Sequence, residues 1–128
     1  MKQLPKKKKI NSKQKGSRGE RDLRDFFKDR GLNARRSQQF AGGTESSDVL
    51  VEEWKATHIE CKFTEHVKPY DFVAQAIKDS GGEKLPVVFW RRNGKKWLAM
   101  FGAEDACYLL SMRELLLSEA RITLPVKK

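Results

Sequence analysis

Residues 57–63 alternate between charged and apolar side chains, and this pattern restricts the fold more than any other feature of the sequence. Successive side chains of a β-strand point to opposite faces of the sheet. Glu60 and Lys62 therefore share one face. Ile59 and Phe63 point to the other face, into a covering layer. The alternation predicts a strand that is covered on one side and presents a carboxylate next to an ammonium group on the other.

The rest of the chain supplies helices and further strands in an order that fits one mixed sheet. Apolar residues at helical spacing predict helices over residues 17–31 and 69–80, and a third helix that starts near residue 103. Short apolar runs predict strands at 33–37, 48–51, 57–63, 85–90 and 97–101. We therefore expect the α/β class, with a mixed central β-sheet flanked by helices.

Local signals set the expected boundaries of these elements. Ser17 and Glu20 match a capping box, so the first helix should begin at residue 17. The polar turn at 52–55 should join its two neighbouring strands as a hairpin, and the Asn-Gly pair at 93–94 should form a two-residue hairpin turn. Whether the leucines at 115–117 continue the third helix or form a separate one stays open.

Length and composition exclude several classes of protein. A chain of 128 residues has the length of one domain. No apolar run approaches the roughly 20 residues that a transmembrane helix needs, and the basic N-terminus is followed by polar residues, unlike a secretory signal. We therefore expect a cytoplasmic protein without a membrane segment, with a basic tail over residues 1–16 and one domain over residues 17–128.

The positive charge is concentrated at the N-terminus. Residues 1–18 contain eight Lys or Arg and no acid, so they carry most of the formal net charge of +10 and leave the remainder nearly neutral. Such a run is either a solvated tail or a nonspecific contact to the phosphates of nucleic acid, and we expect the latter. The run lacks interleaved apolar anchors, which argues against binding to a membrane surface.

Asp48 supplies a second carboxylate close to the alternating strand. It begins the preceding strand, directly after a glycine-rich loop, and a hairpin would bring it beside Glu60. Two carboxylates that meet at a strand edge repel each other unless a cation lies between them. Oxygen ligands of this kind favour Mg²⁺ or Mn²⁺.

Glu20 and Gln75 are polar residues on the sheet-facing sides of their helices. Glu20 lies three and seven residues before Leu23 and Phe27, so its carboxylate can reach inward. As the last residue of a capping box, it also has a purely local role. Gln75 lies three residues after Phe72, and it is either a site residue or a glutamine at the edge of the core.

These residues resemble the PD-(D/E)XK nucleases, in particular the Hjc-type archaeal and phage Holliday junction resolvases. Residues 15–21 are similar to the opening helix of that family. Residues 47–49 (Ser-Asp-Val) resemble its Pro-Asp motif, with a serine in place of the usual proline. Residues 59–62 (Ile-Glu-Cys-Lys) resemble its E-x-K strand, and Gln75 resembles the glutamine of its second helix.

The resemblance implies a metal-dependent reaction. Glu20, Asp48 and Glu60 would bind one or two Mg²⁺ ions, for which Mn²⁺ can substitute. Lys62 would contact the attacking water or the phosphate, with Gln75 as a further catalytic residue. The implied protein is an Mg²⁺-dependent endodeoxyribonuclease that resolves branched DNA, most of all four-way junctions, by paired symmetric nicks as a homodimer.

Further cations are expected to contact DNA. Family members use an arginine and a serine near the first strand. Arg36 and Ser37 are the candidates, with Arg35 beside them, and two later serines at 46–47 compete for the serine role. Arg21 resembles a basic residue that the family uses near the phosphate, or is an ordinary surface arginine. The turn at 93–94 carries four cations that either contact phosphates or are only solvated: Arg91, Arg92, Lys95 and Lys96.

Two alternative functions stay open. Another PD-(D/E)XK DNA endonuclease, of restriction or repair type, needs a target-recognition module, for which 128 residues leave little room. A noncatalytic DNA-binding protein would use the basic tail and turn, but leaves the arrangement of Asp48, Glu60 and Lys62 unexplained. His58 lies on the same strand face as Glu60, and we expect it to be a structural histidine.

Overall fold

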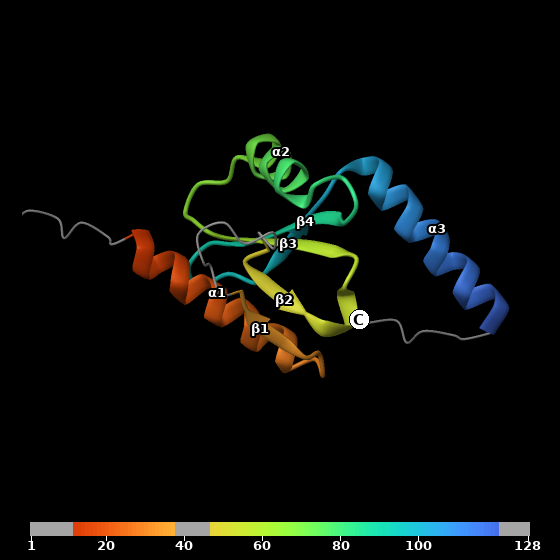
Figure 1. The fold of residues 1–128 in the computed structure, drawn as a ribbon, viewed down its shortest axis with the longest axis horizontal. Helices are drawn as coiled ribbons and strands as arrows, with labels where there is room; N and C mark the ends of the chain where they lie inside the picture. Colours follow the sequence, from red (N-terminus) through yellow and green to blue (C-terminus); the bar gives the residue numbers. More distant parts are fainter. Residues whose placement is uncertain (1–11, 38–46, 121–128) are drawn as a thin grey trace, which may run out of the picture.

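The computed structural model describes residues 12–37 and 47–120, so the basic tail before residue 12 and the glycine-rich loop at 38–46 lie outside the described residues. The expected order of helices and strands is confirmed, and the fold is a mixed α/β arrangement (Figure 1). The elements are α1 (Ser12–Lys28), β1 (Ala34–Arg36), β2 (Val49–Val51), the short 3₁₀ helix η1 (Glu52–Trp54), β3 (Thr57–Phe63), α2 (Pro69–Ser80), β4 (Leu85–Arg91), β5 (Leu98–Met100) and α3 (Ala103–Ala120).

Strand β3 is the centre of the strand arrangement. It pairs in parallel with β4 along its whole length, from Thr57 opposite Leu85 to Phe63 opposite Arg91, and β5 adds antiparallel to the far side of β4. Strands β1 and β2 form a separate antiparallel ribbon. The backbone N–H of Asp48 donates to the carbonyl of Ile59 over 2.8 Å. This bond places the start of β2 against the edge of β3 that faces away from β4.

Helices α1 and α2 lie on opposite sides of these strands (Figure 1). The face of α1 that carries Leu23 and Phe27 is buried against Val49 and Ile59. Gly19 lets α1 approach β3 closely, because a Cβ atom there would lie 2.7 Å from the Cβ of Phe63. Helix α2 covers the other side, where its buried face packs with β4.

The starting point predicted for the first helix is wrong. Helix α1 begins at Ser12, so Ser17 lies within it and Glu20 is not the end of a capping box. The helix extends further because its first turns still contact β3. The side-chain nitrogen of Lys15 lies 5.1 Å and the guanidinium of Arg18 lies 5.8 Å from the centre of the Phe63 ring. These cation–π contacts favour the helical conformation N-terminal to residue 17.

Of the two predicted hairpins, the one between β2 and β3 is wrong, and the one between β4 and β5 forms with a longer loop than predicted. Strand β2 pairs with β1, whereas β3 pairs with β4. The reason is that η1 turns the chain between β2 and β3, so these two strands do not pair as a hairpin. The turn at 93–94 forms, with Gly94 at φ 74°, but the paired strands stop at residue 91 and resume at residue 98. The intervening Trp97 ring stacks with the Arg91 guanidinium at 5.1 Å instead of extending the ladder.

Helix α3 is a single helix that includes the leucines at 115–117. It extends away from the rest of the molecule (Figure 1). Large apolar side chains are exposed along it, among them Tyr108 at 65%, Leu110 at 61% and Leu116 at 61%. Within residues 12–37 and 47–120, no helix combines the length and apolar character needed to cross a membrane.

Candidate active site

Asp48 is fixed at the edge of β3 by two hydrogen bonds. Its backbone N–H donates to the carbonyl of Ile59, and its Oδ2 atom accepts a hydrogen bond from the backbone N–H of Cys61 over 2.8 Å. Asp48 therefore occupies the place of a paired strand residue, with its carboxylate directed along the edge of β3. This arrangement brings it beside Glu60, as the sequence predicted, although β2 and β3 do not form the predicted hairpin.

Glu60 and Asp48 form a tightly coupled pair of carboxyl groups. Glu60 is 4% exposed. Burial and the neighbouring charge of Glu60 raise the pKa of Asp48 to about 8. Burial alone would also raise the pKa of Glu60, but hydrogen bonds from His58 and Asp48 outweigh it and hold that pKa below its usual range. Of the two carboxyl groups, Asp48 is therefore the one that holds a proton more readily.

Lys62 lies on the same face of β3, toward α2. Its ammonium group donates a hydrogen bond to the Oε1 atom of Gln75 over 3.0 Å, and it lies 5.2 Å from the centre of the Phe72 ring. Gln75 is exposed, so it is not a core glutamine. The structure thus brings together Glu60, Lys62 and Gln75 as the sequence predicted.

Glu20 faces inward from α1, but its partner is a cation. The Nη2 atom of Arg36 donates to Oε2 of Glu20 over 3.0 Å, and the two side chains are 34% and 18% exposed. The charge of Glu20 also contributes to the raised pKa of Asp48, so these two carboxyl groups interact electrostatically. Arg36, predicted as a DNA contact, therefore neutralises a predicted metal ligand.

His58 is buried and satisfied, as expected of a structural histidine. Its Nδ1 atom lies 3.1 Å from Oγ of Ser47, and its Nε2 atom lies 2.8 Å from Oε1 of Glu60.

Asp79, at the end of α2, was missed by sequence reasoning. Ligand atoms of His58, Glu60 and Asp79 lie within 4.8 Å of one another. Asp79 follows Gln75 by four residues and so shares its helix face, which is the signal that could have identified it.

The donor set fits a hard divalent cation. The carboxyl groups of Asp48 and Glu60 are close enough to repel each other, and a cation or a proton relieves that repulsion. Carboxylate oxygens are the ligands that Mg²⁺ and Mn²⁺ prefer. Asp48 and Glu60 would hold the ion. Glu20 would join them only if its bond to Arg36 opened.

The predicted DNA-contacting cations divide into two kinds. Arg91 points inward, since it donates to Oδ2 of Asp22 over 2.6 Å and its guanidinium lies 4.6 Å from the centre of the Phe63 ring. It is therefore part of the packing between α1 and β4 and does not project from the turn. Ser37 donates its backbone N–H to the carbonyl of Asp48 and so helps to hold the ribbon together. The remaining predicted cations are exposed: Arg21, Arg35, Arg92, Lys95 and Lys96.

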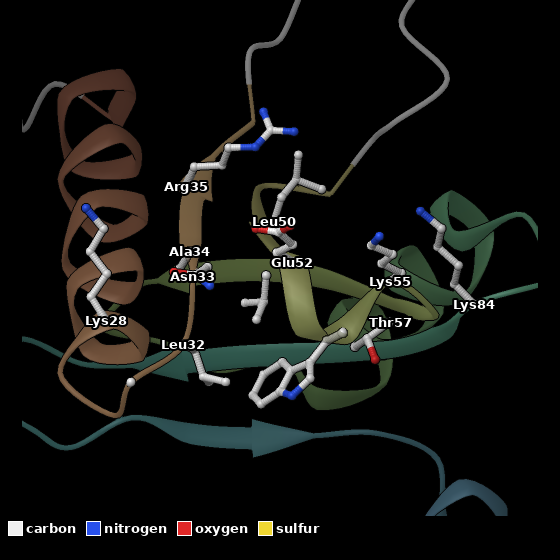
Figure 2. Close-up of a pocket in the computed structure, with 13 residues that line it drawn as sticks. Lys28, Leu32, Asn33, Ala34, Arg35, Leu50, Glu52, Lys55, Thr57 and Lys84 are labelled. Carbon is white, nitrogen blue, oxygen red and sulfur yellow. The ribbon is translucent and has the colours of Figure 1, made fainter.

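Two surface hollows are lined by cations. The ribbon hollow, of about 920 Å³, lies on the outer side of β1 and β2 and contains Glu52 together with Lys28, Arg35, Lys55 and Lys84 (Figure 2). The helix hollow, of about 910 Å³, starts at Phe63 next to Lys62 and contains Glu65 together with Lys13, Lys15, Arg18 and Arg21. In each hollow the four cations outnumber a single acid.

Comparisons with known proteins agree with this geometry. No curated protein matches the chain by sequence. A structure titled "1.6A resolution structure of Archaeoglobus fulgidus Hjc, a Holliday junction resolvase from an archaeal hyperthermophile" is similar in fold, with a TM-score of 0.50 and 23% identity over 67% of this chain and 71% of that chain. The family model described as "Phage putative PDDEXK endonuclease" matches residues 11–127. The chain therefore belongs to this phage PDDEXK endonuclease family, and it has the Hjc-like PD-(D/E)XK fold.

Proposed function

We propose that this endonuclease hydrolyses phosphodiester bonds of branched DNA, preferring four-way junctions, with Mg²⁺ held by Asp48 and Glu60. The observation that carries the proposal is the placement of three groups on or beside β3: the Asp48 carboxylate held by the Cys61 N–H, the buried Glu60 carboxylate, and the Lys62 ammonium two residues after Glu60. PD-(D/E)XK nucleases use divalent metals. A noncatalytic DNA-binding protein has no use for two coupled, buried acids in a basic surface, because each acid repels phosphate.

Each residue has a defined task in this reaction. Asp48 and Glu60 would hold a divalent metal, which would supply an activated water molecule and positive charge beside the phosphate. Asp48 must lose its proton for the site to be competent, and the Cys61 N–H holds its Oδ2 atom in place. The Lys62 ammonium stabilises negative charge on the phosphate, and its bond to Gln75 sets the direction in which it points. Gln75 is exposed, so an incoming strand can reach this ammonium group.

The preference for branched DNA is supported by the placement of positive charge. The helix hollow adjoins the strand end that follows Lys62, whereas the ribbon hollow lies on the outer side of β1 and β2. Sequence-independent phosphate contacts come from such clusters of Lys and Arg. The two hollows are lined by different sets of residues, so a separate DNA arm can occupy each of them. A junction, whose arms diverge, can meet both.

We also propose that the working unit is a homodimer. Helix α3 exposes Tyr108, Leu110 and Leu116, and a second copy of the chain offers the same apolar surface for it to pack against. A dimer places two Asp48–Glu60 sites on one junction, which is what paired nicks require.

Cleavage of a substrate panel tests the function. Linear duplex, a flap and a four-way junction of matched length are incubated with excess protein and Mg²⁺, and in parallel with EDTA. We expect Mg²⁺-dependent cuts at symmetry-related positions of the junction, at rates about tenfold or more above those on duplex. Equal rates on all three substrates would favour a restriction or repair type of endonuclease. Binding without any cut would contradict the nuclease proposal.

A further inference from the structure

We infer that Ser47 and His58 are positioning residues that lock the Glu60 carboxylate in the orientation the metal needs. The inference rests on the proposed metal-dependent nuclease function, and it assigns a role to two residues for which the E-x-K pattern has no requirement. Both residues are 2% exposed. Neither can reach the DNA, so any effect on the reaction passes through Glu60.

The hydrogen bonds around His58 form one directed chain. Oε1 of Glu60 can only accept, so the Nε2 atom of His58, at 2.8 Å, carries a proton and donates it. In the tautomer with its proton on Nε2, Nδ1 is an acceptor, and the hydroxyl of Ser47 donates to it over 3.1 Å. The Ser47 oxygen in turn lies 3.4 Å from the backbone N–H of Ile59, which donates to it. Every hydrogen bond in this series therefore has a defined donor and acceptor, and the Ser47 hydroxyl both donates and accepts.

This series of hydrogen bonds links the two segments that carry the proposed metal ligands. Ser47 directly precedes Asp48, whereas His58 and Ile59 belong to the strand that carries Glu60. The Ser47 hydroxyl thus fixes the Asp48 segment to β3, and His58 fixes one oxygen of Glu60. A proline at position 47, as in the usual Pro-Asp motif, has no hydroxyl and could not make this link.

The hydrogen bonds that join Ser47, His58 and Glu60 are buried, and this burial makes the arrangement rigid. A carboxylate can rotate about its last bond, and a ligand that must be reoriented binds its ion less tightly. The His58 ring is enclosed and held at both nitrogens, so it does not allow Glu60 to turn. Partners that orient a ligand in this way typically contribute about 10–100-fold in metal affinity or activity.

The test measures metal binding separately from cutting. Mn²⁺ binding to the purified protein is followed by electron paramagnetic resonance for the wild type, His58→Leu, His58→Gln and Ser47→Ala. We expect His58→Leu to weaken Mn²⁺ binding by about 10–100-fold and Ser47→Ala to weaken it less. Glutamine keeps an amide donor, so His58→Gln should recover most of the affinity. His66→Leu, at the exposed second histidine, is the control and should bind as the wild type does.

The outcomes distinguish this inference from the proposed function. Wild-type Mn²⁺ affinity in folded His58→Leu and Ser47→Ala proteins would overturn the positioning role, even if both variants melt earlier. If His58→Leu does not fold, the Mn²⁺ affinity of Ser47→Ala, which is a smaller change, decides the question in the same assay. If the wild type itself binds no Mn²⁺ and cuts no DNA, the proposed function fails instead.

Discussion

The Oδ2 atom of Asp48 accepts a hydrogen bond from the backbone N–H of Cys61 over 2.8 Å, so the aspartate carboxylate takes a place in the edge of β3. This bond helps to explain why the carboxyl groups of Asp48 and Glu60 meet although their strands are not a hairpin. Burial and the neighbouring charge of Glu60 raise the pKa of Asp48 to about 8, although the bond from the Cys61 N–H by itself lowers it.

Metal binding should depend on pH through Asp48. Its pKa is raised to about 8 by burial and by Glu60, so below that pH a cation must displace a proton. Apparent Mn²⁺ affinity should therefore rise as pH increases toward 8, by about tenfold per unit where one proton is displaced, and level off above it. Titration calorimetry in buffers of different ionisation enthalpy measures the released proton. No proton release on either side of neutrality would contradict this assignment.

Lys62 and Gln75 should behave as one unit in catalysis. Lys62→Ala removes the ammonium group that we propose stabilises the phosphate, so the single-turnover rate should fall by roughly 100-fold while DNA affinity changes little. Gln75→Ala removes the partner of the ammonium group and should lower the single-turnover rate less, by about tenfold. The double variant should be no slower than Lys62→Ala alone. Additive losses in this double-mutant cycle would show that Gln75 acts independently of Lys62.

Gly19 should be required for the packing of α1 on β3. A Cβ atom there would lie 2.7 Å from Phe63 Cβ, so Gly19→Ala must shift the helix and should destabilise the protein by about 1–3 kcal/mol. Gly16, in the same helix, has no atom within 4 Å of its added Cβ, and Gly16→Ala should stabilise by about 0.5–1 kcal/mol. Urea unfolding of both variants gives the comparison. Equal free energies of unfolding would refute the close contact.

The exposed apolar surface of α3 should hold the dimer together. Leu116→Glu places a charge in that surface and should weaken self-association by about tenfold or more. Ser118→Glu adds the same charge on the opposite side of the helix, where it should have no effect. Sedimentation equilibrium with and without junction DNA measures both. A monomeric wild type on saturated junction DNA would exclude the paired-site dimer while leaving the nuclease chemistry intact.

The alternation of residues 57–63 predicted the bounds of β3 correctly, but it did not predict that Glu60 is buried, because α2 also covers that face of the strand. The bounds of helix α2 were also predicted correctly, since Pro69 starts the helix and Gly81, at φ 70°, ends it. The start of α1 was misplaced because a capping-box pattern at Ser17 competes with cation–π contacts to Phe63 that only the folded chain makes.

The remainder of the site depends on contacts between distant segments. The bond between Arg36 and Glu20 joins residues sixteen positions apart, and the position of Asp79 against His58 depends on how α2 packs over β3. Arg91 looked like part of an exposed turn, yet the nearby Asp22 draws it inward. No periodic pattern marks such pairings, so they become visible only in three dimensions.

The most direct test of the account is single-turnover cleavage of a four-way junction by Glu60→Gln. The substitution removes the charge that the metal needs but keeps the size of the side chain. We predict a rate at least about 100-fold below that of the wild type in Mg²⁺, because several kcal/mol of stabilisation are lost, with junction binding retained. Glu83→Gln, at an exposed acid between α2 and β4, should cut as the wild type does. Undiminished Mg²⁺-dependent cutting by folded Glu60→Gln would contradict the account.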